Sequence, residues 1–284
     1  MSPILCFGEA LLDLLPIGAA PGGAPMNVAY HLHQFGTQAA IVTRLGADAH
    51  GQLLRQFFAE KHLDTSHVQT DEHLPTGTVH VRVTNDEPSY TIVENVAWDA
   101  IAPVTVLKNT PLLVHGSLAL RSTQNQQSLR ALLTSTQARV VFDVNFRAPF
   151  YSKSLIEEWL DNAHMAKLNE HELAEMLPWF ECSDVGNLLQ VFPQLELLIV
   201  TKGGAGAEVL SRTERVSHSG FRVQVADTVG SGDAFLAAFI HYYLKGESLA
   251  HTLEKACAMG AFVASCKGAT PSYKPAEIFR QFGI

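Results

Sequence analysis

A short glycine-rich segment that ends in an acidic residue is the strongest chemical signal in the sequence. It reads Asp-Thr-Val-Gly-Ser-Gly-Asp over residues 227–233, and an apolar helical pattern follows directly. Small residues let backbone N–H groups approach a ligand closely, and a helix N-terminus adds its dipole and its unpaired N–H groups. The segment therefore predicts an anion site made by Gly230, Ser231 and Gly232.

Asp233 is out of place in a site that only binds an anion, because its charge repels phosphate. A carboxylate at this point is useful if it accepts a proton while a phosphoryl group is transferred, so Asp233 is a candidate general base. The residues alone leave a second interpretation open, in which Ser231 or Asp233 simply caps the first turn of the helix.

A second glycine segment lies near the start of the chain. Residues 22–27 read Gly-Gly-Ala-Pro-Met-Asn and lead into a helical pattern over residues 28–35. Gly22 and Gly23 permit a tight turn, and the Asn27 amide offers both a donor and an acceptor to a polyol. A Gly-Pro loop before a helix is also common punctuation, so this segment alone does not decide between the two interpretations.

Several well-known catalytic motifs are absent from the sequence. There is no GxxxxGK[ST] loop, no GxGxxG after the first apolar run and no HExxH. Their absence argues against a P-loop nucleotidase, a dinucleotide-dependent dehydrogenase and a zinc protease. His31 and His33 fall on different faces of a helix, so a metal shared between them is not expected.

The elements that must position these residues alternate along the chain. Apolar runs that predict buried strands occupy residues 4–7, 39–43, 112–115, 140–143, 165–168 and 197–201. Helical patterns lie between them, and the clearest spans residues 236–244 with apolar side chains at i, i+3, i+4, i+7 and i+8. This alternation predicts an α/β fold with a mostly parallel sheet covered on both faces.

Residues 76–92 break the alternation of strands and helices. Val79, Val81 and Val83 alternate with polar residues, residues 85–88 suggest a turn, and Tyr90 and Ile92 resume the alternation. The pattern predicts a β-hairpin without the helix that a parallel crossover needs. Such a hairpin serves as a lid over a site or is an ordinary sheet edge, and both interpretations remain open.

Length and charge restrict the class of protein. The chain has 284 residues, 47% of them hydrophobic, and a net charge of −8, which argues against a broad nucleic-acid surface. Its four cysteines form no CxxC pair, and no apolar run approaches the thickness of a bilayer. We expect a cytoplasmic protein with reduced thiols that binds neither nucleic acid nor membrane.

The two glycine segments, in this order and at this separation, resemble the two signatures of the PfkB (ribokinase-like) family of carbohydrate kinases. Other stretches agree with the same family, and together they cover nearly the whole chain: Gly8-Glu9 with Asp13, and residues 44–48, 169–172 and 201–206. Within the family the chain is most similar to fructokinases, on residues 22–25, 88–92, 97–99 and 143–147. The last of these stretches also resembles 2-keto-3-deoxygluconate kinases.

The resemblance implies a ribokinase-like α/β fold and a phosphotransferase activity. It implies one kinase domain over residues 1–284, with a small β-lid from about residues 10–22 and 75–99. The implied reaction is transfer of phosphate from ATP to a sugar hydroxyl, with fructose and fructose 6-phosphate as the leading pair. A 2-keto-3-deoxygluconate kinase, a nucleoside kinase with an aromatic slot at Tyr90 and Trp98, and a non-catalytic sugar-binding regulator are the alternatives. Lid strands that pair across a two-fold axis would give a homodimer.

The resemblance also assigns roles to residues. Asp233 matches the family's base, and residues 230–232 match its anion hole. The positions that match sugar contacts are Asp13, Gly23 and Asn27. Arg147 is expected to contact the sugar or the phosphate, with a surface ion pair as its alternative.

The remaining matches concern the nucleotide and the metal ions. The stretch with Thr201, Gly203 and Gly206 matches the contacts to the phosphates and ribose of ATP, and residues 256–268 match the adenine pocket, where Cys257 replaces a frequent Asn. Asn169 and Glu172 match the element that holds Mg²⁺ and its waters, and they also fit a helix capping box. Asp227 and Val229 match the loop that can bind a monovalent cation such as K⁺.

Overall fold

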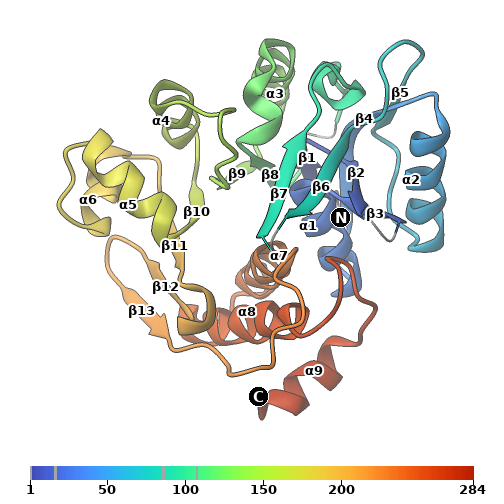
Figure 1. Cartoon of the computed structure of the whole chain (residues 1–284). Coiled ribbons are helices and arrows are strands. Elements are labelled where there is room, and N and C mark those ends of the chain that lie inside the picture. The colour runs from blue at the N-terminus through green and yellow to red at the C-terminus, as the bar shows by residue number, and fades with distance from the viewer. Residues whose placement is uncertain (1, 16–17, 85–86, 107) are drawn as a thin grey trace.

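The chain forms two β-sheets of unequal size. This computed structural model describes residues 2–15, 18–84, 87–106 and 108–284. Within them, the larger sheet has nine strands in the order β13-β12-β11-β10-β9-β8-β1-β4-β5, and the smaller has four in the order β3-β2-β6-β7. Figure 1 shows the smaller sheet standing above helix α7, near the middle of the molecule.

The larger sheet confirms the predicted α/β architecture. Its strands are parallel from β5 to β11, and only β12 and β13 run antiparallel to their neighbours. All the predicted apolar runs are strands. The strands are β1 (Ile4–Phe7), β4 (Ala39–Gly46), β5 (Val68–Asp71), β8 (Leu112–Gly116), β9 (Arg139–Asp143), β10 (Met165–Asn169), β11 (Leu197–Thr201), β12 (Ala207–Leu210) and β13 (Arg215–His218).

Helices cover both faces of the larger sheet because the side chains of each strand alternate between them. In β1, Ile4 and Cys6 belong to one apolar cluster, and Leu5 and Phe7 belong to the other. The first cluster packs against α1 (Ala24–Gln34), α2 (Ala49–Glu60), α7 (Ser231–Leu244), α8 (Leu249–Ala264) and α9 (Pro275–Phe282). The second packs against α3 (Thr123–Ser135), α4 (Lys153–Asp161), α5 (Glu170–Trp179) and α6 (Val185–Val191).

Helix α7 is the most enclosed of the helices that position the site. Every residue from Asp233 to Tyr242 is buried, and the helix packs between α1 and α8. Such surroundings require apolar residues on all sides of a helix, which explains the composition of this segment. None of the helices in the described part of the chain combines the length and apolarity needed to cross a bilayer.

The smaller sheet is the lid that the sequence predicted. It consists of β2 (Leu11–Leu15), β3 (Gly18–Gly22), β6 (Thr78–Thr84) and β7 (Glu87–Ile92). The hairpin β6–β7 joins the N-terminal segment through a parallel pairing of β2 with β6. The predicted turn over residues 85–88 extends too far, because Glu87 and Pro88 already lie in β7. Asn85 and Asp86, the rest of that turn, lie outside the described residues.

Candidate active site

The N-terminus of α7 is the centre of the candidate site. Its N-cap residue, Gly230, has a φ angle of +77°, in the left-handed region. A Cβ atom at this position would lie only 2.5 Å from the Cβ atom of Ala269. Both the backbone angle and the packing therefore require glycine at the turn into the helix.

The N–H groups at this turn are only partly used by the protein itself. Those of Ser231 and Asp233 donate to the carbonyl oxygens of Thr228 and Gly230, at 3.3 and 3.1 Å. The N–H groups of Gly230 and Gly232 donate to no acceptor within the described residues. The geometry thus leaves two free donors at a helix N-terminus, whereas Ser231 is turned back toward Thr228 through its hydroxyl group as well, at 2.8 Å.

Asp233 lies buried in the first turn of α7 and points at α1. Its Oδ2 atom accepts a hydrogen bond from Nδ2 of Asn27 at 2.8 Å. The helix has no side-chain cap, so the interpretation of Ser231 or Asp233 as a simple N-cap is wrong. Burial raises the pKa of Asp233 to about 6, and the neighbouring Asp143 adds to the rise. Such a group is ionised at pH 7 and still basic enough to accept a proton.

The residues predicted to contact a sugar come from separate elements and gather around this carboxylate. Asn27 bonds to Asp233 directly, and the charge of Arg147 acts on both Asp233 and Asp13. Burial, followed by the nearby Asp227, raises the pKa of Asp13 to about 6. The side chain of Arg147 is exposed and donates to the carbonyl oxygen of its neighbour Phe146; it has no ion pair among the described residues.

Gly23 and Glu9 are packed against each other beneath the start of α1. Gly23 has a φ angle of +115°, and a Cβ atom there would lie 2.4 Å from the carbonyl oxygen of Glu9. The buried Glu9 side chain accepts a hydrogen bond from the N–H group of Ala24 at 3.3 Å, while its Oε2 atom has no partner among the described residues. Burial raises the pKa of Glu9 to about 7. The sequence had assigned no role to Glu9, although an acid inside an apolar run is a signal.

Two further charged residues were missed on neighbouring strands, one at the end of β9 and one in the middle of β10. Lys167 of β10 and Asp143 of β9 are register partners and form a buried ion pair at 2.9 Å. A Cβ atom on Gly232 would lie 3.1 Å from Nζ of Lys167, so the pair lies directly against the first turn of α7. A lysine within the apolar run 165–168 was the available signal.

Asn169 and Glu172 form the predicted capping box at the start of α5. Oδ1 of Asn169 accepts the N–H group of Glu172 at 2.9 Å, and Oε2 of Glu172 accepts the N–H group of Asn169 at 2.8 Å. Oε1 of Glu172 also accepts the N–H group of Phe146 at 2.9 Å. Oδ1 of Asn169 also accepts the N–H group of His171 at 2.9 Å, which occupies its second lone pair. Each carboxylate oxygen of Glu172 accepts one of these bonds, so its other lone pair can accept from a water bound to Mg²⁺. Within the described residues, no three His, Cys, Asp or Glu side chains gather at metal-ligand spacing.

A cavity of about 190 Å³ joins the two predicted nucleotide stretches to the turn before α7. Thr201, Gly203 and Gly206 line one side, and Ser231 and Gly232 line another. The α8 side consists of Cys257, Gly260, Ala261 and Ala264. Burial raises the pKa of the Cys257 thiol to about 12, so this side of the cavity is uncharged.

Asp227 organises the loop that leads into α7. Its Oδ1 atom accepts the N–H group of Val229 at 3.0 Å, and its Oδ2 atom accepts the N–H group of Gly268 at 3.1 Å. The side chain of Val229 is exposed. The predicted cation-binding residues are thus neighbours in one turn, and a cation there stays a prediction.

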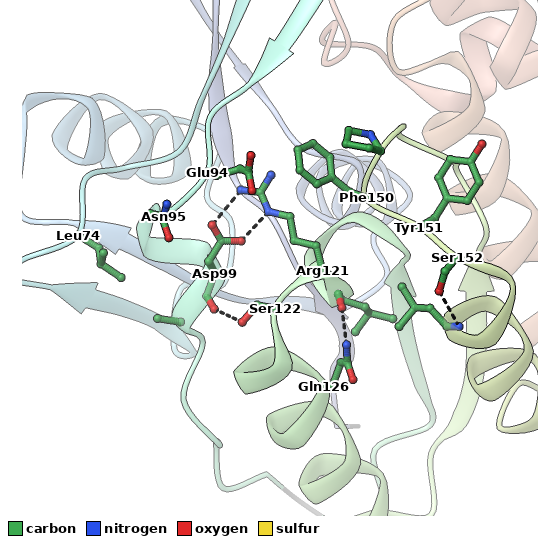
Figure 2. A pocket seen from close by; sticks show the side chains of 14 residues that line it. Leu74, Glu94, Asn95, Asp99, Arg121, Ser122, Gln126, Phe150, Tyr151 and Ser152 are labelled. Atoms are coloured by element: carbon green, nitrogen blue, oxygen red, sulfur yellow. Dashed lines mark hydrogen bonds and ion pairs between the residues drawn. The ribbon is translucent and has the colours of Figure 1, made fainter.

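A second and larger cavity, of about 630 Å³, lies away from these residues. Figure 2 shows Arg121 at its edge, with its guanidinium group directed at Asp99. Two hydrogen bonds of 2.8 Å join these side chains, and a third, of 2.7 Å, reaches the carbonyl oxygen of Val93, just after β7. Arg121 also lies over the rings of Trp98 and Phe150. These contacts of Arg121 hold the segment that follows β7 against the rest of the protein. No predicted site residue lines this cavity.

Comparison with known proteins agrees with the fold and gives the family. Residues 16–276 match the model of the pfkB family carbohydrate kinases. The chain belongs to this family. Rice fructokinase-1 (Oryza sativa subsp. japonica) is 28% identical over 310 residues, which cover 97% of this chain and 95% of the relative.

Solved structures of other kinases have the same fold. The fructokinase from Xylella fastidiosa with bound ATP superposes with a TM-score of 0.91 at 24% identity and covers 99% of both chains. The aminoimidazole riboside kinase from Salmonella enterica, complexed with its riboside and an ATP analog, has a TM-score of 0.84 at 22% identity, covering 99% of this chain and all of the other. Kinases named for different acceptors thus share this ribokinase-like architecture, so the fold alone does not identify the acceptor.

Proposed function

We propose that this PfkB carbohydrate kinase transfers the terminal phosphoryl group of ATP to the primary 6-hydroxyl of fructose. The observation that carries the proposal is the buried carboxylate of Asp233 beside the two free N–H groups of Gly230 and Gly232. The same turn lines the cavity that the nucleotide stretches share. The fructokinase relatives point to fructose among the hexoses.

In the proposed reaction, residues of the chain hold the acceptor hydroxyl between Asp233 and the phosphate. Asp233 takes the hydroxyl proton, and Asn27 keeps the carboxylate oriented through its amide group. The N–H groups of Gly230 and Gly232 stabilise charge that develops on the phosphoryl oxygens. Asp13 accepts sugar hydroxyls, and Arg147 reaches the sugar or the phosphate.

Metal ions and assembly complete the proposal. Mg²⁺ would be held with its waters by Asn169 and Glu172, where it would neutralise charge on the ATP phosphates. A monovalent cation such as K⁺ would bind at Asp227 and Val229. Equal rates in potassium, sodium and choline chloride would remove that cation from the proposal. A homodimer through the lid strands is tested by the mass of the protein in light scattering, and a monomer at working concentration would exclude it.

The alternative acceptors differ in what they require of the lid. A nucleoside needs an aromatic slot, but Trp98 is fully buried and its ring is covered by Arg121 at 4.1 Å. The prediction that Trp98 helps to form such a slot is therefore wrong, and Tyr90 has a side chain outside the described residues. No observation at the site favours a nucleoside over a sugar.

The test is ADP release from ATP with a panel of acceptors that includes fructose, ribose, 2-keto-3-deoxygluconate and adenosine. We expect fructose to have the highest kcat/KM and Asp233→Asn to lower it by at least ~10²-fold. Asp161→Asn makes the same chemical change at the exposed end of α4 and is expected to leave the rate unchanged. A higher kcat/KM for another acceptor would replace fructose, and full activity of Asp233→Asn would reject the assigned base.

A further inference from the structure

A buried ion pair lies immediately below the turn that carries Asp233. Nζ of Lys167 is 2.9 and 3.0 Å from the two carboxylate oxygens of Asp143. The side chains of Lys167 and Asp143 are only 10% and 4% exposed. Because the two residues are direct partners in the parallel pair β9–β10, the backbone of the sheet fixes their relative position.

The surroundings of Lys167 act on its charge in opposite directions. Burial opposes the charged ammonium group, whereas the carboxylates of Asp143, Asp233 and Glu172 stabilise it, and together they raise the pKa of Lys167. The positive end of the α7 dipole and the unpaired N–H groups of its first turn lie toward the ammonium group, which a Cβ atom on Gly232 would approach to 3.1 Å. A buried ion pair also stabilises a protein poorly compared with apolar residues of the same volume. Stability alone therefore does not account for Lys167 and Asp143 at these positions.

Charged and polar groups from several elements act on Asp233. Lys167 of β10 and Arg147, in the loop after β9, favour its ionised form, as does the hydrogen bond from Asn27 of α1. Asp143 at the end of β9 favours its protonated form, as does burial. The charge of Asp233 in turn adds to the raised pKa of Glu9, which follows β1. Of the two cationic groups, only Lys167 is buried, and its two hydrogen bonds go to Asp143 rather than to Asp233.

We propose that Lys167 and Asp143 are positioning residues that set the protonation of Asp233, with Lys167 keeping it ionised and Asp143 holding Lys167 back from a direct ion pair with it. A direct pair would make Asp233 a weaker base and would block the acceptor hydroxyl. An absent lysine would leave the base protonated when phosphate arrives. The proposal rests on the proposed function in that Asp233 is the base.

The test is the pH dependence of kcat/KM, whose acid limb reports the ionisation of the base in the free enzyme. Lys167→Met removes a positive charge, so the midpoint of the acid limb should move to higher pH by about one unit, which is the usual effect of a close charge. Asp143→Asn removes a negative charge, so the limb should move down by a similar amount. The double variant should lie between the two single variants. Lys255→Met is the matched control, because Lys255 pairs with Glu247 at 2.7 Å and lines neither cavity.

Opposite shifts of the two single variants would support the proposal. Damage to the fold would lower kcat without a change in the midpoint of the acid limb. Midpoints that stay in place, or that move in the same direction in both variants, would overturn the proposal. If Lys167→Met is insoluble, Asp143→Asn decides the question alone, because activity retained to lower pH is not a result of misfolding.

A second readout separates this inference from the proposed function. The carboxyl resonance of Asp233 in protein labelled with ¹³C-aspartate, assigned by its loss in Asp233→Asn, gives its pKa without any turnover. If the pKa of Asp233 shifts in opposite directions in Lys167→Met and Asp143→Asn but the protein phosphorylates no acceptor, the roles of Lys167 and Asp143 are supported and the proposed kinase function is rejected. Unshifted titrations in an active kinase would reject the inference alone.

Discussion

Replacement of Gly230 by alanine tests two reasons for glycine at the turn before α7: the left-handed backbone angle and the close contact with Ala269. An alanine with φ near +77° costs about 1–2 kcal/mol for its left-handed backbone. Its Cβ atom would also lie 2.5 Å from the Cβ atom and 2.6 Å from the Cα atom of Ala269, and overpacking of this kind costs about 1–3 kcal/mol. We therefore expect Gly230→Ala to lower the free energy of unfolding by about 2–5 kcal/mol.

Gly36→Ala is the control for the backbone term. Gly36 has a φ angle of +76°, and no atom lies within 4 Å of the position of an added Cβ atom. It should lose only about 1–2 kcal/mol, and the entropy that alanine removes from the unfolded chain is the same in both variants. The difference between the two variants, measured by urea unfolding, is therefore the cost of contact with Ala269.

Activity gives an independent measure of the same displacement. If the added methyl group moves the N–H groups of residues 230 and 232 by about 1 Å, kcat should fall by about 10²-fold in Gly230→Ala and stay unchanged in Gly36→Ala. Equal losses of stability in the two variants would refute the claim that Ala269 crowds this turn.

Three other expectations can be checked with the same methods. Burial raises the pKa of Asp233 from 3.8 to about 6, so its ionisation destabilises the folded protein at any pH above the unfolded pKa. Asp233→Asn should therefore raise the free energy of unfolding, measured in urea, by about 3 kcal/mol at pH 7 and by roughly half of that at pH 5. Arg121→Met leaves the Asp99 carboxylate and the Val93 carbonyl without their partner, so it should lower the free energy of unfolding by about 3 kcal/mol. An unchanged free energy of unfolding would show that other contacts hold the lid against the larger sheet. The α8 side of the nucleotide cavity offers the Cys257 thiol and small apolar residues, so GTP should support turnover with a kcat/KM within ~10²-fold of that of ATP, and stronger discrimination would mean that polar groups select the base.

The sequence predicted six of the nine strands of the main sheet because these six are buried on both faces. Such strands consist of continuous apolar runs, and the runs found in the sequence became β1, β4, β8, β9, β10 and β11. The edge strands β5 and β13 were missed, since their residues are mostly partly buried or exposed and do not form such runs. The buried strand β12 was also missed, because Glu208 interrupts its short apolar run. The strand β3 reads Gly-Ala-Ala-Pro-Gly, and only its pairing with β2 defines it.

The site was predictable where its chemistry depends on local sequence. Residues 230–233 combine small residues, a helix start and an acid within four positions, and residues 169–172 form a capping box within four positions. Glu9, Asp143 and Lys167 were missed, because their importance comes from contacts with segments far away in the chain. No linear pattern indicates that the Lys167 ammonium group lies beneath Gly232.

The charges around Asp233 form a consistent arrangement for a carboxylate that must work beside an anion. Bound phosphate would raise the pKa of Asp233 further, because like charges oppose each other at short distance. The hydrogen bond from Asn27 and nearby positive charge offset that rise, and Arg147 and Lys167 are the cationic side chains that lower this pKa. Arg147 is exposed, so its position can change as ligands enter and leave. Lys167 is held in place by its ion pair with Asp143 within the sheet. Its effect on the pKa of Asp233 therefore stays constant throughout the catalytic cycle, in contrast to that of Arg147.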